Sequence, residues 1–145
     1  MRSPRLLGSV MVLGLLGVGL AGCSSDDDNS ADPTSAASET AASSLGVADF
    51  ESLVAQDGVR IIDVRTADEY ATGHLAGATN IDVQGDFAAG IADLDQDATY
   101  ALYCRSGVRS DTARQAMLDA GFTHVVDLSG GITAWTQAGK PVVTE

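Results

Sequence analysis

From residue 45 onward, short apolar runs alternate with segments of helical pattern, and this alternation limits the chain to few architectures. The runs that predict strands span residues 59–64, 99–103 and 124–128, with shorter ones at 45–47 and 78–81. Helices are expected over residues 48–56, 67–71, 86–94, 110–120 and 132–138. This order is typical of α/β units around a largely parallel sheet. We therefore expect a single α/β domain over residues 45–145.

Two of the expected helices carry local signals. Thr66, followed three residues later by Glu69, makes a capping box at the start of helix 67–71, and Gly73 fits its end. In helix 110–120, small and apolar residues fall at intervals of i, i+3, i+4 and i+7, namely Ala113, Ala116, Met117 and Ala120. That spacing predicts a narrow stripe that faces the core.

The charge and the cysteine count exclude several classes of function. The chain has 145 residues and a formal net charge of −12, from 20 acidic and 8 basic residues. Such an acidic chain repels nucleic acid and anionic lipid headgroups, so we exclude nucleic acid as a partner. Its two cysteines, Cys23 and Cys104, support neither a disulfide framework nor a paired-cysteine zinc site. We expect no metal and no cofactor.

Residues 1–22 have the layout of a signal peptide. Arg2 and Arg5 precede an apolar run over residues 6–21, which is short for a membrane span of about 20 residues. The Leu-Ala-Gly that precedes Cys23 resembles the lipobox of bacterial lipoproteins, in which the peptide is cut before the cysteine and that cysteine is acylated. The resemblance implies a palmitate-type lipid anchor on Cys23, on the extracytoplasmic side of a bacterial membrane. The alternatives are an uncleaved anchor and an ordinary secretory signal.

Residues 24–44 differ in composition from everything that follows. They contain seven Ser and five acidic residues, and no large apolar residue. A segment of this kind cannot bury a core, so we expect a flexible tether. The predicted organisation is a signal peptide over residues 1–22, an acylated Cys23 with a tether to residue 44, and the α/β domain over 45–145.

The segment that carries chemistry is the loop after the strand 99–103. That strand stops at Cys104, which is followed by Arg105, Ser106, Gly107, Val108 and Arg109 before the next helix. In parallel α/β sheets, ligands bind at this end of the strands. The helix N-terminus and the two arginines favour thiolate over thiol. Gly107 lets successive backbone amides converge on one anion, so the ligand should be negatively charged.

Basic residues gather around this loop. Residues 45–145 contain 15 acidic and 6 basic residues, and three of the six are Arg105, Arg109 and Arg114. For Arg114 we favour an ion pair with Asp111 or another acid at the surface, since such pairs are common and nearly neutral in energy. For Arg105 and Arg109, which bracket the cysteine loop, we favour a role in binding.

Other interpretations of Cys104 are less favoured. One is a buried structural thiol, because cysteine is among the residues most often buried. Since Arg, Ser and Gly follow Cys104 at once, we do not expect burial in an apolar core. His74 and His124 are distant in sequence, so neither a histidine-assisted hydrolase nor a metal site is favoured.

Three ordered blocks, within residues from about 45 to 143, resemble the motifs of single-domain rhodaneses. They are Ile62-Asp63-Val64-Arg65 with Glu69-Tyr70, Gly73-His74-Leu75-Ala76-Gly77-Ala78 and Asn80-Ile81; Cys104-Arg105-Ser106-Gly107-Val108-Arg109; and Leu128-Ser129-Gly130-Gly131-Ile132-Thr133-Ala134-Trp135. The resemblance implies a rhodanese-like three-layer domain, with about five mainly parallel strands flanked by helices.

The same resemblance implies a sulfurtransferase. Cys104 would take sulfane sulfur from a small anionic donor such as thiosulfate, hold it as a persulfide, and pass it to a thiol or to cyanide. Arg105 and Arg109 would orient the donor and stabilise the leaving sulfite. The loop amides of residues 106–108 would hold the terminal sulfur.

The first block is interpreted mainly as structural. Asp63, Arg65 and Glu69 would brace the strand end against the helix start, and His74 would be a packed, hydrogen-bonded residue. The alternatives for the whole domain are a non-catalytic rhodanese-like binding module, a persulfide carrier and a small phosphatase. The fold resembles that of cell-cycle phosphatases, whose cysteine loop is one residue longer, so the shorter loop here suits a single sulfur better than a phosphate.

Overall fold

The computed structural model describes residues 43–144, in which strands and helices alternate from end to end. The elements are β1 (Ser44–Leu45), α1 (Val47–Val54), β2 (Arg60–Asp63), α2 (Ala67–Ala71), β3 (Ala78–Asn80), α3 (Phe87–Ile91), β4 (Thr99–Tyr103), α4 (Val108–Asp119), β5 (His124–Leu128) and α5 (Gly131–Gln137). Within these residues, no helix has the length and apolar content that a membrane span requires. The expected signal peptide, Cys23 and the tether up to residue 42 lie outside the described residues.

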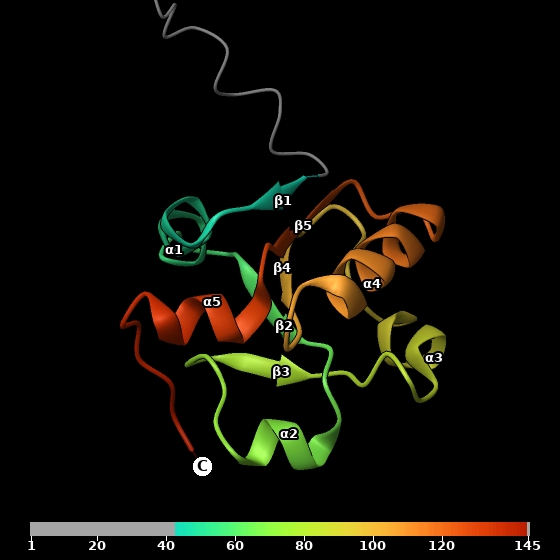
Figure 1. Cartoon of the computed structure of the whole chain (residues 1–145). Helices are drawn as coiled ribbons and strands as arrows, with labels where there is room; N and C mark the ends of the chain where they lie inside the picture. Colours follow the sequence, from blue (N-terminus) through green and yellow to red (C-terminus); the bar gives the residue numbers. More distant parts are fainter. Residues whose placement is uncertain (1–42, 145) are drawn as a thin grey trace, which may run out of the picture. The chain divides into compact units, whose positions relative to one another are not determined.

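The five strands form one sheet in the order β1-β5-β4-β2-β3, and all four pairings are parallel (Figure 1). The predicted α/β class and the five strands are therefore confirmed. Because β4 lies at the centre, between β5 and β2, the residue that follows it is surrounded by the ends of its neighbours.

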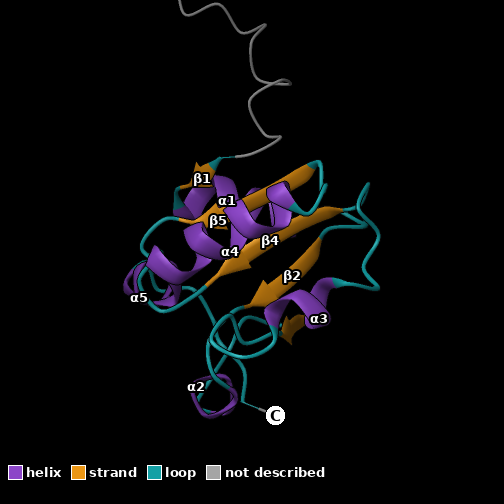
Figure 2. Cartoon of the chain, turned by 90° about the vertical axis from the view of Figure 1, so that its right-hand side faces the viewer, coloured by secondary structure: helices purple, strands orange, loops and turns teal. Residues whose placement is uncertain are grey.

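Helices cover both faces of the sheet. Figure 1 shows α1 and α5 on one side and α3 and α4 on the other, and Figure 2 shows α3 and α4 in front of the strands. Successive residues of β4 alternate between the two faces, as strand geometry requires. Tyr100 and Leu102 pack with Met117 of α4, whereas Ala101 and Tyr103 pack with Trp135 of α5. The result is a three-layer domain with an apolar core on each face.

The helix signals are confirmed at α2 and partly at α4. The Thr66 hydroxyl accepts from the Glu69 N–H, and the Glu69 carboxylate accepts from the Thr66 N–H, so the capping box is complete. In α4, Ala113 and Met117 are buried, but the other two members of the predicted stripe are exposed. The buried face instead includes Ser110, which lies three residues before Ala113 and seven before Met117 and therefore on the same face of the helix. α4 also begins two residues earlier than expected.

β1 ties the start of the domain to β5. The Asp127 N–H donates to the Ser43 carbonyl at 3.2 Å, and the Ser129 N–H donates to the Leu45 carbonyl at 2.8 Å. The expected strand 45–47 is thus displaced, since Ser44, the last residue assigned to the tether, is the first of β1 and residue 47 already belongs to α1. Backbone pairing with β5, which composition alone does not reveal, sets this boundary.

Candidate active site at the Cys104 loop

Cys104 lies directly after β4, at the edge of the sheet where β2 and β5 also end. The Val64 N–H, just past β2, donates to the carbonyl of Tyr103 at 3.0 Å. The Ile132 N–H, in the first turn after β5, donates to the carbonyl of Cys104 at 2.8 Å. The parallel sheet therefore brings the three sequence blocks together at one edge.

The Cys104 side chain is buried, and the expectation that it lies outside the core is wrong. Its exposed fraction is 0%, and it belongs to the apolar cluster between the sheet and α4. The physical reason is strand alternation: Tyr100, Leu102 and Cys104 all point to the same face, so the cysteine continues the buried series one step past the strand. The Ala113 side chain of α4 belongs to the same cluster.

The loop nevertheless turns an amide toward the sulfur. The Gly107 N–H donates to Cys104 Sγ at 3.1 Å. Gly107 has φ 98°, a left-handed conformation that favours glycine, and it is the N-cap of α4. Within residues 43–144, the N–H groups of residues 105, 106, 108 and 109 donate to no protein acceptor. These groups remain available to an anion bound at the loop.

The third sequence block, residues 128–135, forms hydrogen bonds with the backbone of the cysteine loop. The Thr133 N–H and hydroxyl both donate to the Arg105 carbonyl, at 3.2 and 2.8 Å. Gly131 has φ 58°, and a Cβ there would lie 2.4 Å from the Cys104 carbonyl oxygen, well inside contact distance. A Cβ on Gly107 would likewise lie 3.0 Å from the Gly130 nitrogen. The close approach of the two loops therefore requires glycine on both sides.

Arg109 is paired with Glu69. Its Nη1 and Nη2 donate to Glu69 Oε2 and Oε1 at 2.8 and 2.9 Å, a bidentate contact between α4 and α2. This contact, with help from Thr66, lowers the pKa of Glu69 from 4.5 to about 2. Glu69 in turn raises the pKa of Arg109, with Cys104 as a smaller contributor. The guanidinium of Arg109, which the sequence predicted to bind the donor, is therefore already paired with a carboxylate.

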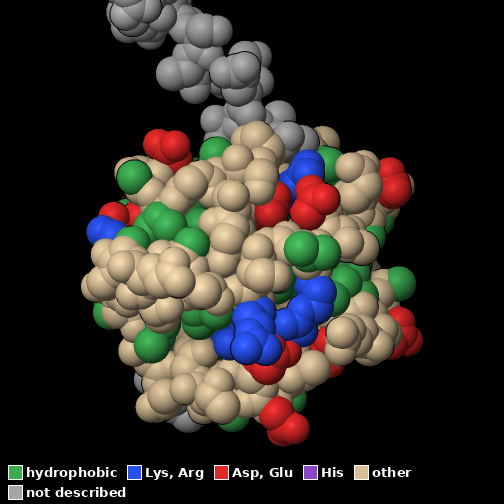
Figure 3. Space-filling view, in the orientation of Figure 1, with side chains coloured by type: hydrophobic (Ala, Val, Ile, Leu, Met, Phe, Trp, Pro, Cys, Tyr) green, Lys and Arg blue, Asp and Glu red, His purple; other side chains and the backbone are tan. Residues whose placement is uncertain are grey.

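Arg105 has a different environment. Its side chain is exposed, and within residues 43–144 it makes no ion pair or side-chain hydrogen bond. Figure 3 shows basic side chains gathered with acidic ones on this face of the molecule. Arg114 pairs with Asp111, as expected, and also with the buried Asp127, which the sequence did not indicate.

Asp63 and Arg65 form a buried ion pair beneath the site. Arg65 Nε and Nη2 contact Asp63 Oδ2 at 2.9 and 2.6 Å, and Nη2 also donates to the Gly73 carbonyl at 2.7 Å. Burial alone would lower the pKa of Arg65, but Asp63 and Tyr103 together outweigh burial and raise it. The Tyr103 hydroxyl accepts from the Leu75 N–H at 3.0 Å, and burial raises the pKa of this phenol. These contacts join the end of β2 to the segment between α2 and β3.

Asp127 is a buried polar residue that sequence reasoning missed. Its carboxylate accepts from the Ser44 hydroxyl at 3.1 Å, from the Ser110 hydroxyl at 3.4 Å and from Arg114 Nε at 2.9 Å. Burial raises its pKa, although Ser44 and Arg114 oppose this shift. The Ser110 hydroxyl also lies 3.0 Å from the Gly107 carbonyl, so the network reaches the cysteine loop. The sequence does contain a signal that could have identified this residue, because Asp127 is a carboxylate among the apolar residues 125–128 of β5.

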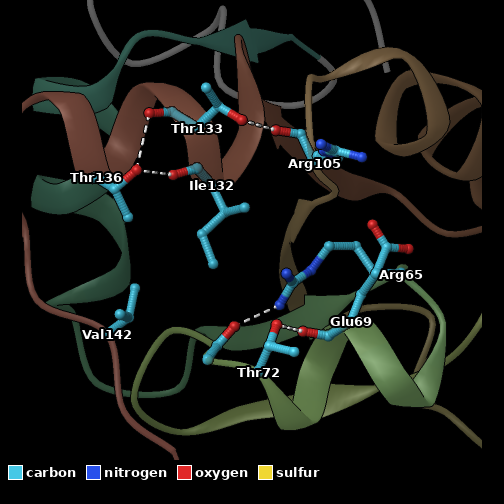
Figure 4. Close-up of a pocket in the computed structure, with 9 residues that line it drawn as sticks. Arg65, Glu69, Thr72, Arg105, Ile132, Thr133, Thr136 and Val142 are labelled. Carbon is cyan, nitrogen blue, oxygen red and sulfur yellow. Dashed lines mark hydrogen bonds between the residues drawn. The ribbon is translucent and has the colours of Figure 1, made fainter.

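A pocket of about 400 Å³ lies beside the cysteine loop (Figure 4). Arg105 lines it at the loop, α2 and α5 supply opposite walls, and Val142 lines it from the C-terminal segment. Ile132 points into it from α5 (Figure 4). Cys104 does not line this pocket, and sequence reasoning missed Ile132 and Val142 because nothing local marks them.

Comparison with known proteins places these features in a family context. A model of the rhodanese-like domain family matches residues 46–138, a range that includes all three blocks. Thiosulfate sulfurtransferase 16 of Arabidopsis thaliana is 37% identical over 95 residues, which cover 58% of this chain and 79% of that relative. The probable adenylyltransferase/sulfurtransferase MoeZ of Mycobacterium tuberculosis is 43% identical over 82 residues, or 56% of this chain. This chain spans only 21% of the length of MoeZ.

A solved structure shows the same arrangement. The crystal structure of a rhodanese-related protein from Thermoplasma volcanium matches with a TM-score of 0.64 at 31% identity. The match covers 70% of this chain and 98% of that one. The similarity therefore extends over nearly the whole of the solved chain.

Proposed function

The chain belongs to the rhodanese-like domain family, and from this premise we propose that it is a sulfurtransferase that works through a persulfide on Cys104. Sulfurtransferases are among its relatives. The observation that carries the proposal is the Gly107 N–H directed at Cys104 Sγ at 3.1 Å, in a loop whose neighbouring amides have no acceptor in the described part of the chain. Backbone amides without protein acceptors can stabilise a sulfur anion at the point where charge develops.

The proposed reaction has two displacement steps. The Cys104 thiolate attacks the outer sulfur of thiosulfate, a new S–S bond forms, and sulfite leaves with the electrons of the bond that breaks. A thiolate or cyanide then attacks the outer sulfur of the persulfide, and Cys104 is released as thiolate. Arg105, exposed and without a carboxylate partner in residues 43–144, is suited to orient the anionic donor.

The burial of the sulfur favours a small donor. Because Cys104 is 0% exposed, a donor reaches Sγ only if the loop shifts, and a larger donor requires a larger shift. The Cys104 and Arg105 carbonyls accept hydrogen bonds from the Ile132 and Thr133 N–H groups in the first turn of α5, and these bonds oppose such a movement. The pairing of Arg109 with Glu69 suggests that Arg109 mainly positions the loop, and that it adds positive potential near the sulfur.

The test is to mix the purified protein with thiosulfate and to measure the mass of the Cys104 peptide, followed by thiocyanate after cyanide is added. We expect the mass of one additional sulfur atom on that peptide, and thiocyanate in proportion to it. A Cys104→Ser variant should lose both, because its hydroxyl forms no persulfide. Equal thiocyanate from the variant would contradict the mechanism. Faster turnover of p-nitrophenyl phosphate than of thiosulfate would favour the phosphatase alternative.

We also propose that the protein is anchored to the extracytoplasmic side of a bacterial membrane through acylated Cys23. Support comes from the sequence, in which an apolar run and Leu-Ala-Gly precede that cysteine. Two or more acyl chains are needed for stable anchoring, and a modified cysteine supplies them. Mass spectrometry of the mature N-terminus tests this: an unmodified Cys23 would refute the anchor and leave the sulfur chemistry unaffected.

A further inference from the structure

The buried carboxylate of Asp127 lies between the first strand of the domain and the cysteine loop. Its Oδ1 accepts a hydrogen bond from Arg114 Nε at 2.9 Å, and its Oδ2 accepts one from the Ser44 hydroxyl at 3.1 Å. The Ser110 hydroxyl lies 3.4 Å from the same Oδ2 and 3.0 Å from the Gly107 carbonyl oxygen. One carboxylate therefore contacts both β1 and the hydroxyl that reaches the cysteine loop.

The Ser110 hydroxyl has a single hydrogen and two acceptors within reach. The shorter contact is to the Gly107 carbonyl, and the hydrogen can remain there as long as Asp127 Oδ2 has another donor. Ser44 supplies that donor. Without the Ser44 hydroxyl, the buried Oδ2 would lose its closer donor, and a buried acceptor without a donor is costly. The Ser110 hydrogen would then turn from Gly107 to Asp127.

Gly107 is the residue whose position matters to the sulfur. Its N–H donates to Cys104 Sγ at 3.1 Å. Its carbonyl accepts from the Asp111 N–H at 3.0 Å, within the first turn of α4, and from the Ser110 hydroxyl. If the Ser110 hydrogen turned away, Gly107 would lose its only side-chain donor within residues 43–144 and gain freedom to rotate its N–H away from the sulfur.

We propose that Ser44 is a positioning residue for Cys104, and that it acts through Asp127 and Ser110 on the Gly107 amide. Ser44 lies before residues 46–138, the range that the family model matches, so the match itself assigns it no role. The two-residue strand β1 therefore supports the site as well as the edge of the sheet. The proposal deepens the proposed function, but its effect on the Cys104 thiolate is measurable without any sulfur donor.

Three substitutions in the full-length protein test the role of the hydroxyl. Ser44→Ala removes it from an exposed residue, so the fold should persist. Ser44→Thr keeps a hydroxyl on the strand and is the conservative rescue. Ser43→Ala is the matched control, because within residues 43–144 the Ser43 hydroxyl makes no hydrogen bond. All three exchange neutral side chains, so Asp127 keeps the charged groups that face it, Arg114 and Asp111.

The first readout is the pH profile of the alkylation of Cys104 by iodoacetamide, measured on its peptide. This reaction requires the thiolate, which the Gly107 N–H stabilises. Ser44→Ala should raise the pH midpoint of the profile by about 0.5–1 pH unit, the equivalent of one net hydrogen bond. Ser44→Thr and Ser43→Ala should keep the wild-type midpoint. A role in stability alone would change urea unfolding without moving this pH midpoint.

A double-substitution cycle identifies the route. Ser110→Ala should raise the pH midpoint by a similar amount, and adding Ser44→Ala to it should raise the midpoint no further, because the hydrogen that Ser44 directs is gone. Additive effects would show that Ser44 acts by another route and would overturn the proposal. An unchanged midpoint in Ser44→Ala would overturn it as well. If Ser110→Ala fails to fold, the comparison of Ser44→Ala with Ser44→Thr still decides.

Loading with thiosulfate separates this inference from the proposed function. Below the pH midpoint, Ser44→Ala should lower the rate of persulfide formation at saturating thiosulfate about threefold to tenfold, the equivalent of that change in midpoint. The half-saturating concentration should not change, because Ser44 contacts the loop only through other residues. If wild type adds no sulfur but the alkylation midpoints differ as described, the proposed function fails and the positioning role stands. If wild type is loaded and the midpoints do not differ, the positioning role is refuted and the proposed function stands.

Discussion

Glu69 connects two parts of the site that are 40 residues apart in sequence. Its carboxylate accepts hydrogen bonds from the two terminal guanidinium nitrogens of Arg109, and also from the Thr66 N–H at the start of α2. One acidic side chain thus completes a helix cap and orients Arg109, the arginine at the end of the cysteine loop. Both side chains are partly exposed, at 29% for Glu69 and 24% for Arg109, so the pair is accessible to solvent and salt.

This pair predicts a pH dependence of stability. The folded protein holds the pKa of Glu69 at about 2, below its ordinary value of 4.5, so the unfolded chain binds the proton more readily. The stabilisation is therefore fully present above pH of about 4.5 and is lost as the pH falls toward 2. For a pair this exposed we expect about 1 kcal/mol.

The measurement is urea unfolding of wild type and Glu69→Gln between pH 2 and 7. Glu69→Gln should be less stable than wild type near neutral pH, and the difference should vanish toward pH 2. Glu51→Gln, which removes a carboxylate from the exposed pair with Lys140, serves as the control. A difference between Glu69→Gln and wild type that stays constant across this range would show that the ion pair is not the cause.

At the residue scale, the sequence located the candidate cysteine of the site but misjudged its burial. The residues after Cys104 are polar, and that was taken as a sign of exposure, whereas the alternation of Tyr100, Leu102 and Cys104 determines the direction of the side chain. The ion pair between Arg109 and Glu69 could not be predicted from the sequence, because it joins α4 to α2 and the relative position of these helices depends on the whole sheet.

At the scale of elements, the cysteine loop and the first turn of α5 form one unit. Gly131, with φ 58°, lies so close to the Cys104 carbonyl that any Cβ would overlap it. The two backbone bonds from Ile132 and Thr133 then fix the loop against the helix. The shape of the loop is therefore determined partly by a segment more than 20 residues further along the chain.

Gly131→Ala should move the loop. Gly139 also has positive φ, at 73°, but a Cβ there meets no atom within 4 Å, so Gly139→Ala measures the backbone cost alone. We expect about 1 kcal/mol of destabilisation for Gly139→Ala. Gly131→Ala should cost about 2–4 kcal/mol, since the steric overlap adds to the backbone term. Urea unfolding gives both values.

A second readout follows the loop itself. The rate at which iodoacetamide alkylates Cys104, measured on its peptide, should rise in Gly131→Ala and stay at the wild-type value in Gly139→Ala. Equal stabilities and equal alkylation rates in the two variants would show that the contact with Gly131 does not hold the loop.

Most elements were predicted within two or three residues of their ends, since apolar runs and helix caps are local signals. Two of the small differences have physical causes. β1 has only two residues, Ser44 and Leu45, and exists through its pairing with β5. α4 starts at Val108 because Gly107 adopts a left-handed conformation that lets the helix begin inside the cysteine loop.

At the scale of the whole molecule, the buried pair of Asp63 and Arg65 joins elements that the sheet alone does not connect. Asp63 ends β2, and Arg65 reaches the Gly73 carbonyl beyond α2. Their side chains are 0% and 6% exposed. A charge left without its partner at this depth is strongly unfavourable.

Asp63→Ala should therefore destabilise the protein by about 3–5 kcal/mol, the range for breaking a buried pair from one side. Glu51→Ala, which breaks the exposed pair with Lys140, should cost no more than about 1 kcal/mol. Chemical denaturation of both variants tests this contrast. Similar losses in the two variants would mean that the buried pair does not brace the domain.

The whole-molecule architecture was predictable because the alternation of strands and helices over residues 45–145 admits few arrangements, and the family resemblance selected one. The pocket was not predictable. Its lining comes from α2, α5, the C-terminal segment and the residues Arg65 and Arg105, and the pairing of His74 with Val143 places the C-terminal segment beside α2. Contacts between such distant segments leave no local pattern.

The absence of a side chain at Gly131 has a consequence for protein engineering. Transplanting residues 104–109 alone onto another parallel sheet would leave the carbonyls of Cys104 and Arg105 without their donors. A portable version of this site would have to include residues 130–133 as a second insert, at matched spacing. The smallest graft that preserves the geometry is thus two short peptides rather than one.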